Sequence, residues 1–233
     1  MATDRGLLPK ADPDELDEQL QRRLERWFAN AYRDDNLFLT MARRPGMLDA
    51  AWGFIRYIYG GESSVEPQLA ELARVKLAWN NGCVHCSLAR SNTATSRAAP
   101  EGADPSTGAA TFERQVARLD DYEGSDLPER TKMALRLADA ISMAPAVVDE
   151  HFYARLKEQF TDDEILDLGM TIAFFSGWQR FIESFKIVPD RWNEGDPLPF
   201  SALALPDLPD TDTDTDADAT PDAGAHLEEN GSR

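Results

Sequence analysis

Lysine, cysteine and long apolar stretches are all scarce in this sequence of 233 residues. The 42 acidic residues outnumber the 24 lysines and arginines, so the formal net charge is −18. That charge repels phosphate backbones and anionic lipid headgroups, which excludes nucleic acid and anionic membrane as expected partners. No apolar run approaches the ~20 residues that a helix needs to cross a bilayer.

Residues 1–13 also lack the apolar core of a secretory signal. We therefore expect a cytoplasmic protein. The chain has only two cysteines, three positions apart. In a reducing compartment such a pair is more often catalytic or metal-binding than a structural disulfide.

The periodicity of the apolar residues predicts an all-α fold. No convincing alternation of apolar and polar residues, which would indicate a half-buried strand, occurs in the sequence, whereas apolar residues recur at helical spacing. Hydrophobic residues make up 42%, enough for a core. We predict helices over residues 13–32, 37–59 (with a break near 44–46), 67–79, 83–91, 112–119, 128–142, 147–160 and 161–189.

Two of these helices carry additional signals. Thr161-Asp-Asp-Glu164 is a capping box at the start of the last one. The helix over residues 67–79 is apolar nearly all round, so we expect it to be buried. By contrast, residues 93–108 are rich in Ala, Ser, Thr, Pro and Gly, which predicts a surface loop.

Composition divides the chain into three parts. We predict a flexible N-terminus over residues 1–12, an all-α domain over 13–200 and a disordered acidic tail over 201–233. The tail contains Pro/Asp/Thr repeats, including the alternating stretch 211–216. Such a segment buries too little apolar surface to offset the entropy lost on ordering. A solubilising extension is the simplest role for it.

The chemistry of the chain is predicted to lie at Cys83 and Cys86, which follow Gly82. A helix beginning at Cys83 places the two thiols one turn apart, within bridging distance. The start of a helix lowers a thiol pKa, and the thiolate attacks peroxide to give a sulfenic acid. A second thiol then condenses with that acid, forming a disulfide and water.

His85 lies between the cysteines, and Glu71 is one of three charged residues on the preceding apolar helix, beside Arg74 and Lys76. A Glu71–His85–thiol relay would remove the proton from the attacking sulfur and deliver one to the leaving oxygen. On its own, Glu71 could equally be an ion-pair partner of Arg74 at i,i+3.

Glu71, twelve positions before Cys83, and the motif Cys83-Val84-His85-Cys86 make this sequence similar to the alkylhydroperoxidase D / carboxymuconolactone decarboxylase family. The resemblance covers roughly residues 36–189, including flanking segments at 36–45 and 160–180. It implies an all-helical, oligomeric protein, a trimer or a larger ring such as a hexamer. It also implies that Cys86 attacks the peroxide and that Cys83 resolves the sulfenic acid.

One position departs from the family pattern. A histidine is expected four residues after Cys86, where this chain has Arg90. At that spacing Arg90 would share a helix face with Cys86 and could stabilise its thiolate electrostatically. It cannot act as a general base, because an arginine pKa is too high. Trp178 and Arg180 are expected to pack or pair at a subunit interface.

The resulting prediction is a thiol-dependent peroxidase that reduces hydroperoxides. A thioredoxin-like or lipoyl-bearing protein would reduce the Cys83–Cys86 disulfide again, and no bound cofactor is required. Alternatives are a non-enzymatic redox sensor or a disulfide oxidoreductase. A lactone decarboxylase has no use for a cysteine pair, and a zinc module needs about four ligands, whereas His151 and His226 are remote in sequence.

Overall fold

The computed structural model describes residues 6–30 and 35–188. The predicted tail over residues 201–233 and the end of the first predicted helix at Tyr32 lie outside these ranges, as does His226. The proposed domain boundary at residue 200 also lies outside them and stays a prediction.

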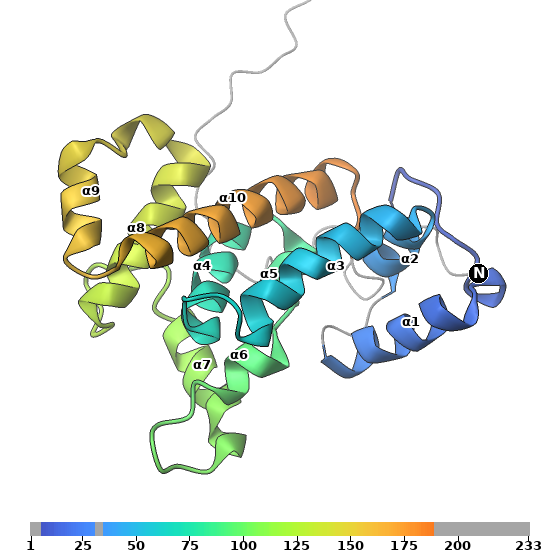
Figure 1. Ribbon diagram of the computed structural model, residues 1–233, viewed down its shortest axis with the longest axis horizontal. Coiled ribbons are helices and arrows are strands. Elements are labelled where there is room, and N and C mark those ends of the chain that lie inside the picture. Colours follow the sequence, from blue (N-terminus) through green and yellow to red (C-terminus); the bar gives the residue numbers. More distant parts are fainter. Residues whose placement is uncertain (1–5, 31–34, 189–233) are drawn as a thin grey trace, which may run out of the picture. The chain divides into compact units, whose positions relative to one another are not determined.

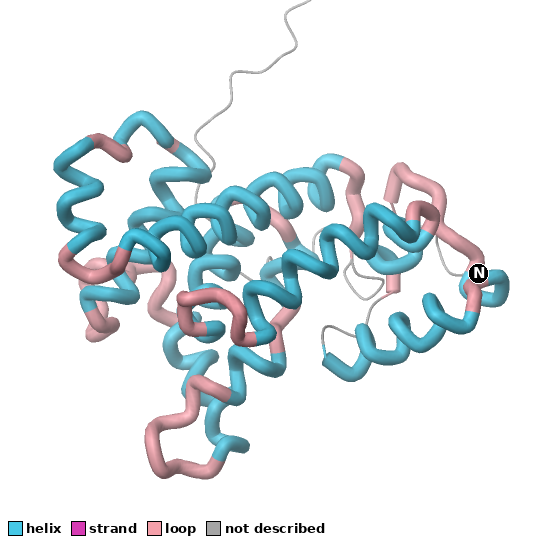
Figure 2. Tube along the Cα trace, viewed as in Figure 1, coloured by secondary structure: helices cyan, strands magenta, loops and turns pink. Residues whose placement is uncertain are grey.

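Regular structure in the described residues is helical throughout, which confirms the predicted all-α class (Figures 1 and 2). The elements, in chain order, are η1 (Pro13–Glu15), α1 (Glu18–Asn30), α2 (Asn36–Ala42), α3 (Pro45–Gly60), α4 (Pro67–Asn80), α5 (Val84–Leu88), α6 (Asn92–Ser96), η2 (Pro105–Thr107), α7 (Gly108–Val116), α8 (Glu129–Met143), η3 (Pro145–Val147), α9 (Glu150–Lys157) and α10 (Asp162–Ser184). None of the helices in the described ranges is both long and apolar enough to span a bilayer.

Helix α4 lies at the centre of the described fold. From Leu69 to Trp79 its residues are all buried, as the apolar character of both its faces predicts. It packs mainly against α8 and α10, and also against α5, α6 and α7 (Figure 1). One of its sides therefore contributes to the core shared with α8 and α10, while its C-terminal end leads into the cysteine segment.

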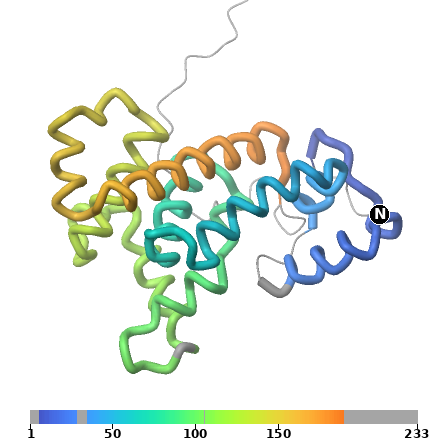
Figure 3. Tube along the Cα trace, in the orientation of Figure 1, coloured from blue at the N-terminus to red at the C-terminus, as the bar shows by residue number. Residues whose placement is uncertain are grey.

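Helices α3 and α10 pack against each other over part of their length, far apart in sequence (Figure 3). Phe54 of α3 lies 4.7 Å from Phe174 of α10, measured between ring centroids. The start of α10 has the predicted capping box. The Thr161 side chain accepts a hydrogen bond from the Glu164 backbone N–H, and the Glu164 side chain accepts one from the Thr161 backbone N–H. The helix ends at Ser184, a few residues before the predicted stop.

Two predictions about the middle of the chain are wrong. Residues 93–108 are not a plain surface loop, because α6 begins at Asn92 and buries Ala94 and Thr95. A Cβ on Gly108 would lie 2.4 Å from the carbonyl oxygen of Thr95, so only glycine fits where α7 meets α6. Small residues in this stretch therefore allow close packing rather than mark an exposed loop.

The predicted helix over 83–91 is also too long. Helix α5 spans only Val84–Leu88, because Ala89 adopts an extended conformation (φ −67°, ψ 143°). The next helix then starts from Ser91, whose side chain accepts a hydrogen bond from the Ala94 N–H. The cysteine segment is thus a single short turn held between two breaks.

Candidate active site

Cys83 and Cys86 lie at the start of α5, which follows a tight turn after α4. Gly82 adopts φ +63°, a left-handed conformation that glycine takes without steric cost. Cys83 is the N-cap residue, and its Sγ accepts a hydrogen bond from the Cys86 N–H at 3.4 Å. The two Sγ atoms of these free thiols are 2.6 Å apart, so no backbone movement is needed to join them.

Cys86 lines a cavity of ≈ 500 Å³, and Cys83 does not. Cys83 is fully buried (0% exposed) beside Cys86, which is 5% exposed. The cavity walls are mainly aromatic and aliphatic side chains from α1, α2, α3 and α10: Trp27, Leu37, Trp52, Ile55, Tyr59, Phe175 and Trp178. One sulfur therefore faces a space large enough for an organic molecule, while the other is in contact only with its partner and the core.

Glu71 lies in the same cavity wall and has four hydrogen-bond donors around its carboxylate. Arg74 donates from Nε at 2.8 Å and from a terminal nitrogen at 2.9 Å. The Tyr59 hydroxyl donates at 2.5 Å and the Ser91 backbone N–H at 2.9 Å. A carboxylate offers about four acceptor positions, so these donors account for the capacity of Glu71.

Arg74 links Glu71 to the cysteine segment, a role that the sequence did not reveal. Its two terminal nitrogens donate to the backbone carbonyls of Cys86 and Ala89, each at 2.6 Å. These bonds satisfy carbonyl groups at the end of α5 and fix where the helix stops. The available signal was a cation on an otherwise apolar helix, three residues after Glu71.

The charges of this pair follow from its burial and contacts. Burial alone would raise the pKa of Glu71, but the charge and hydrogen bonds of Arg74, with those from Tyr59 and Ser91, lower it below its ordinary value. Burial alone would likewise lower the pKa of Arg74, and Glu71 reverses that effect. Both groups are therefore ionised at neutral pH.

The pKa of Cys86 is shifted the other way. Burial raises it well above its ordinary value, and the hydrogen bond and charge of Cys83 add to that increase, while the positive charge of Arg74 opposes it. The expectation that the helix start lowers the thiol pKa is thus wrong for Cys86. A helix of five residues provides little dipole, and the sulfur is removed from water.

His85 is buried, lines the same cavity and stacks on Trp27, with ring centroids 6.3 Å apart and an interplanar angle of 16°. Burial, and then the charge of Arg74, lower its pKa to about 4. At neutral pH the imidazole is uncharged and can accept a proton. The donors to the carboxylate of Glu71 come from Arg74, Tyr59 and Ser91, and the predicted Glu71–His85 relay stays a prediction.

Arg90 does not share a helix face with Cys86, because α5 ends at Leu88. It lines the cavity, but its guanidinium pairs with Glu113 of α7 at 2.7 Å and donates to the Ser87 carbonyl at 2.6 Å. The predicted shared helix face is therefore wrong, and the stabilisation of the thiolate by Arg90 stays a prediction. The arginine whose charge lowers the pKa of Cys86 is Arg74.

A second carboxylate near α5, that of Glu183, was not predicted. Glu183 lies on α10 and accepts a hydrogen bond from the Val84 N–H, while its Oε2 is buried without a hydrogen-bond partner among the described residues. Burial raises its pKa, and its charge would raise that of Cys86. About 100 residues separate it from α5, so sequence spacing gave no signal.

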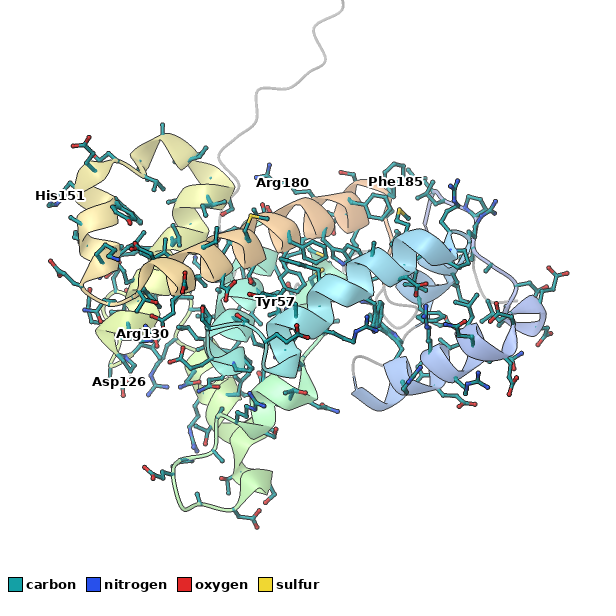
Figure 4. All side chains as sticks on the ribbon, viewed as in Figure 1. Tyr57, Asp126, Arg130, His151, Arg180 and Phe185 are labelled. Carbon is teal, nitrogen blue, oxygen red and sulfur yellow. The ribbon has the colours of Figure 1, made fainter. Side chains whose placement is uncertain are left out.

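The remaining predicted residues make other contacts. His151 is exposed on α9, at the edge of the view in Figure 4. Arg180 donates to the Asn81 side chain at 3.1 Å and to the Ser142 carbonyl at 2.5 Å. Trp178 stacks on Phe174 at 5.5 Å and also lines the cavity. Within residues 6–30 and 35–188, no three His, Cys, Asp or Glu side chains are grouped as a metal site would require.

Comparison with models of known protein families finds no match, and neither does comparison with curated proteins. Solved structures do match. One is the alkylhydroperoxidase AhpD core of an uncharacterized peroxidase-related protein from Ralstonia eutropha JMP134, at TM-score 0.60 and 20% identity, covering 79% of this chain and 92% of that one. Another is an uncharacterized peroxidase-related protein from Silicibacter sp. TM1040, at TM-score 0.59 and 21% identity, covering 78% and 89%.

These likenesses define the class of fold. The described chain has the all-helical fold of the alkylhydroperoxidase D core, which confirms the predicted architecture. At 20% and 21% identity, these likenesses show the fold alone.

Proposed function

We propose that this protein is a thiol-dependent peroxidase that reduces hydroperoxides through a Cys83–Cys86 dithiol–disulfide cycle. The observation that carries the proposal is the position of the two sulfurs. Cys86 lines a cavity, and the wholly buried Cys83 lies 2.6 Å from it, sulfur to sulfur. An attacking thiol needs access to substrate, whereas a resolving thiol needs to reach only the attacking sulfur. The peroxidase-related names of the structural neighbours agree with this proposal.

The reaction takes two steps on the protein. The Cys86 thiolate attacks the terminal peroxide oxygen, the O–O bond breaks, and the departing alkoxide takes up a proton to become an alcohol. Cys86 is left as a sulfenic acid. The Cys83 thiol then attacks that sulfur, so that the S–S bond forms and hydroxide leaves with a proton as water. A dithiol reductant, thioredoxin-like or lipoyl-bearing, restores both thiols by exchange.

Proton transfer is assigned to His85. Because the pKa of Cys86 is raised, little thiolate exists before substrate binds, and the thiol proton must be removed. The neutral imidazole of His85 lines the same cavity and can take this proton and return it to the leaving oxygen. Arg74 lowers the cost of the thiolate, and Glu71 holds Arg74 in place.

Substituting each cysteine separately tests this assignment. Cumene hydroperoxide consumption with a dithiol reductant should be abolished in Cys86→Ser. In Cys83→Ser, a single turnover should leave a sulfenic acid on Cys86 that dimedone traps and mass spectrometry locates. His151→Gln, on the exposed surface of α9, is the matched control and should retain wild-type turnover. Wild-type protein that forms the disulfide yet consumes no hydroperoxide would refute the peroxidase function.

The raised pKa of Cys86 favours one second candidate, a redox sensor or disulfide oxidoreductase. A buried thiol with little thiolate reacts slowly with peroxide, which argues against rapid removal of oxidant and leaves a single oxidation to the disulfide as the alternative outcome. Stopped-flow oxidation of the reduced protein distinguishes the two. A sensor would oxidise once, change its assembly and show no turnover with excess dithiol.

Assembly into a homo-oligomer belongs to the same proposal. On α10, Leu166 and Met170 are 64% and 52% exposed and lie one turn apart. Exposed large apolar side chains in one area are typical of a protein interface. Light scattering of the full chain should give a trimer or hexamer mass, and Met170→Glu should lower it.

A further inference from the structure

The cavity beside Cys86 reverses the charge balance of the chain. The protein carries a formal net charge of −18, yet the described residues that line the cavity include five arginines and a single acid, Glu71. The arginines come from three parts of the chain, α1, α3 and the α4–α5 region: Arg23, Arg26, Arg56, Arg74 and Arg90. In a chain with so many more acids than bases, this concentration of cations indicates an anionic ligand.

Three of the five arginines form ion pairs with carboxylates of other described residues. Arg74 pairs with Glu71, Arg90 with Glu113 and Arg23 with Asp49. Arg56, on α3, has neither an ion pair nor a hydrogen bond with any residue in the described ranges, and its side chain is exposed. Arg26, on α1, is exposed as well and has a partner of its own. The exposed side chain of Arg56 therefore leaves positive charge in the outer part of the cavity.

The inner part of the cavity has a different character. Cys86, His85 and Glu71 are buried there, and the surrounding walls are the aromatic and aliphatic side chains given above. A volume of ≈ 500 Å³ lies within the range of about 300–1,000 Å³ found for drug-sized ligands. Hydrogen peroxide is close in size to water, which takes about 30 Å³ in the liquid. Hydrogen peroxide alone would leave most of this apolar space unfilled.

We infer that the preferred substrate is a hydroperoxide of an apolar carboxylic acid. This inference rests on the proposed peroxidase function and specifies the substrate class of the same site. The apolar body would contact Trp52 and Trp178, and the hydroperoxide would reach Cys86. The carboxylate would lie near Arg56 and Arg26 at the exposed end. Two sources share this chemistry: a long-chain fatty-acid hydroperoxide and the hydroperoxide of a compact aromatic acid.

The chemical step is that of the proposed peroxidase reaction. The terminal oxygen of the hydroperoxide is transferred to the Cys86 sulfur, the organic part leaves as a hydroxy acid, and the dithiol reductant supplies two electrons and two protons overall. The carboxylate takes no part in bond breaking. Its contact with arginine is the same before and during the reaction, so the effect should appear in KM rather than in kcat.

Two matched pairs of hydroperoxides test the inference. The first pair is linoleic acid hydroperoxide and its methyl ester, dispersed in the same non-ionic detergent. The second is cumene hydroperoxide with a para-carboxylate and cumene hydroperoxide itself. Wild-type kcat/KM should favour the carboxylate by about tenfold in at least one pair, because two exposed charge contacts each contribute about threefold. The pair that shows the preference identifies the source.

Substitutions then connect the preference to the arginines. Arg56→Gln should lower the ratio of carboxylate to neutral substrate about threefold, and Arg26→Gln/Arg56→Gln should bring it close to one. Arg43→Gln makes the same charge change at an exposed residue outside the cavity and should keep the wild-type ratio. Salt should weaken the preference, since exposed charges are screened within about 8–10 Å at physiological ionic strength. A wild-type ratio near one in both pairs would overturn the inference.

A binding measurement separates this inference from the proposed function. Trp27, Trp52 and Trp178 line the cavity, so their fluorescence reports on occupancy. Decanoate should bind more tightly than decanol, and Arg56→Gln should remove most of that difference. If no hydroperoxide is consumed but decanoate still binds in this way, the peroxidase function fails and the carboxylate site stands. If cumene hydroperoxide is consumed and the two probes bind equally, only the substrate class fails.

Discussion

Two carboxylates lie near α5, and burial affects both, yet their pKa values move in opposite directions. Glu71, on α4, has donors on both oxygens, and the charge of Arg74 lowers its pKa below the ordinary value. Glu183, on α10, has a bond from the Val84 N–H but a buried Oε2 without a partner in the described part of the chain, and burial raises its pKa. The difference shows that partners, rather than depth, decide the charge of a group near these thiols.

Removing Arg74 should have the largest effect on the contrast between Glu71 and Glu183. Arg74→Met leaves the Glu71 carboxylate buried without its cation and frees two carbonyls at the end of α5. Loss of one member of a buried ion pair typically costs about 3–5 kcal/mol. We expect a decrease of that size in the free energy of unfolding, measured by urea titration, together with loss of peroxidase turnover.

The double variant Glu71→Gln/Arg74→Met is the matched control, since it removes both charges at once. It should recover part of the lost stability, because no uncompensated charge is left in the core. Arg43→Met, on the surface, should change stability by less than about 0.5 kcal/mol. Equal losses in the single and double variants would mean that Arg74 acts by packing alone.

Changing His85 should have the next largest effect, on rate rather than on stability. A positioned acid or base contributes roughly 10²–10⁴-fold, so His85→Gln should lower kcat/KM for cumene hydroperoxide by about 100-fold. Because the pKa of His85 is lowered to about 4 and that of Cys86 is raised, wild-type kcat/KM should rise steadily with pH through the neutral range. A step near pH 6.5 would show instead that His85 titrates as an ordinary exposed histidine.

Local sequence signals predicted the fold well and the partners of the site poorly. The capping box at Thr161 and the uniformly apolar α4 follow from residues a few positions apart, which sequence patterns report directly. The end of α5 depends on Arg74, which reaches carbonyls 12 and 15 residues further along the chain. The predicted position of Arg90, on the same helix face as Cys86, was wrong for the same reason, because α5 ends at Leu88. The contact of Glu183 with Val84 links α10 to α5 and has no local signal.

Glu71→Gln should change how the stability of the protein depends on pH. The folded-state pKa of Glu71 lies below the unfolded value, so its stabilising effect is complete above the ordinary range of a glutamate. That effect is lost as pH falls through the folded-state value. The amide should cost about 3 kcal/mol at pH 7, the lower end for a broken buried ion pair, because Arg74 loses its counter-charge while the amide oxygen still accepts a hydrogen bond. Urea titrations between pH 6 and 3 should show a shallower loss of stability in the variant than in wild type.

Glu183→Gln should give the smallest effect, with the opposite sign. The folded-state pKa of Glu183 is raised, so between its unfolded and folded values the folded protein binds more protons, and its stability falls as pH rises. Replacing the acid with an uncharged amide removes that loss. The variant should therefore be more stable than wild type at pH 8, by at most about 1 kcal/mol, because the side chain is partly exposed.

The same substitution also acts on the thiol. The charge of Glu183 raises the pKa of Cys86, so the variant should have more thiolate and react a few-fold faster with iodoacetamide at pH 8. Glu158→Gln, on the surface after α9, should change neither stability nor alkylation rate. A Glu183→Gln protein that is less stable and no faster to alkylate would contradict the comparison. It would mean that both oxygens of Glu183 have hydrogen-bond partners, as those of Glu71 do.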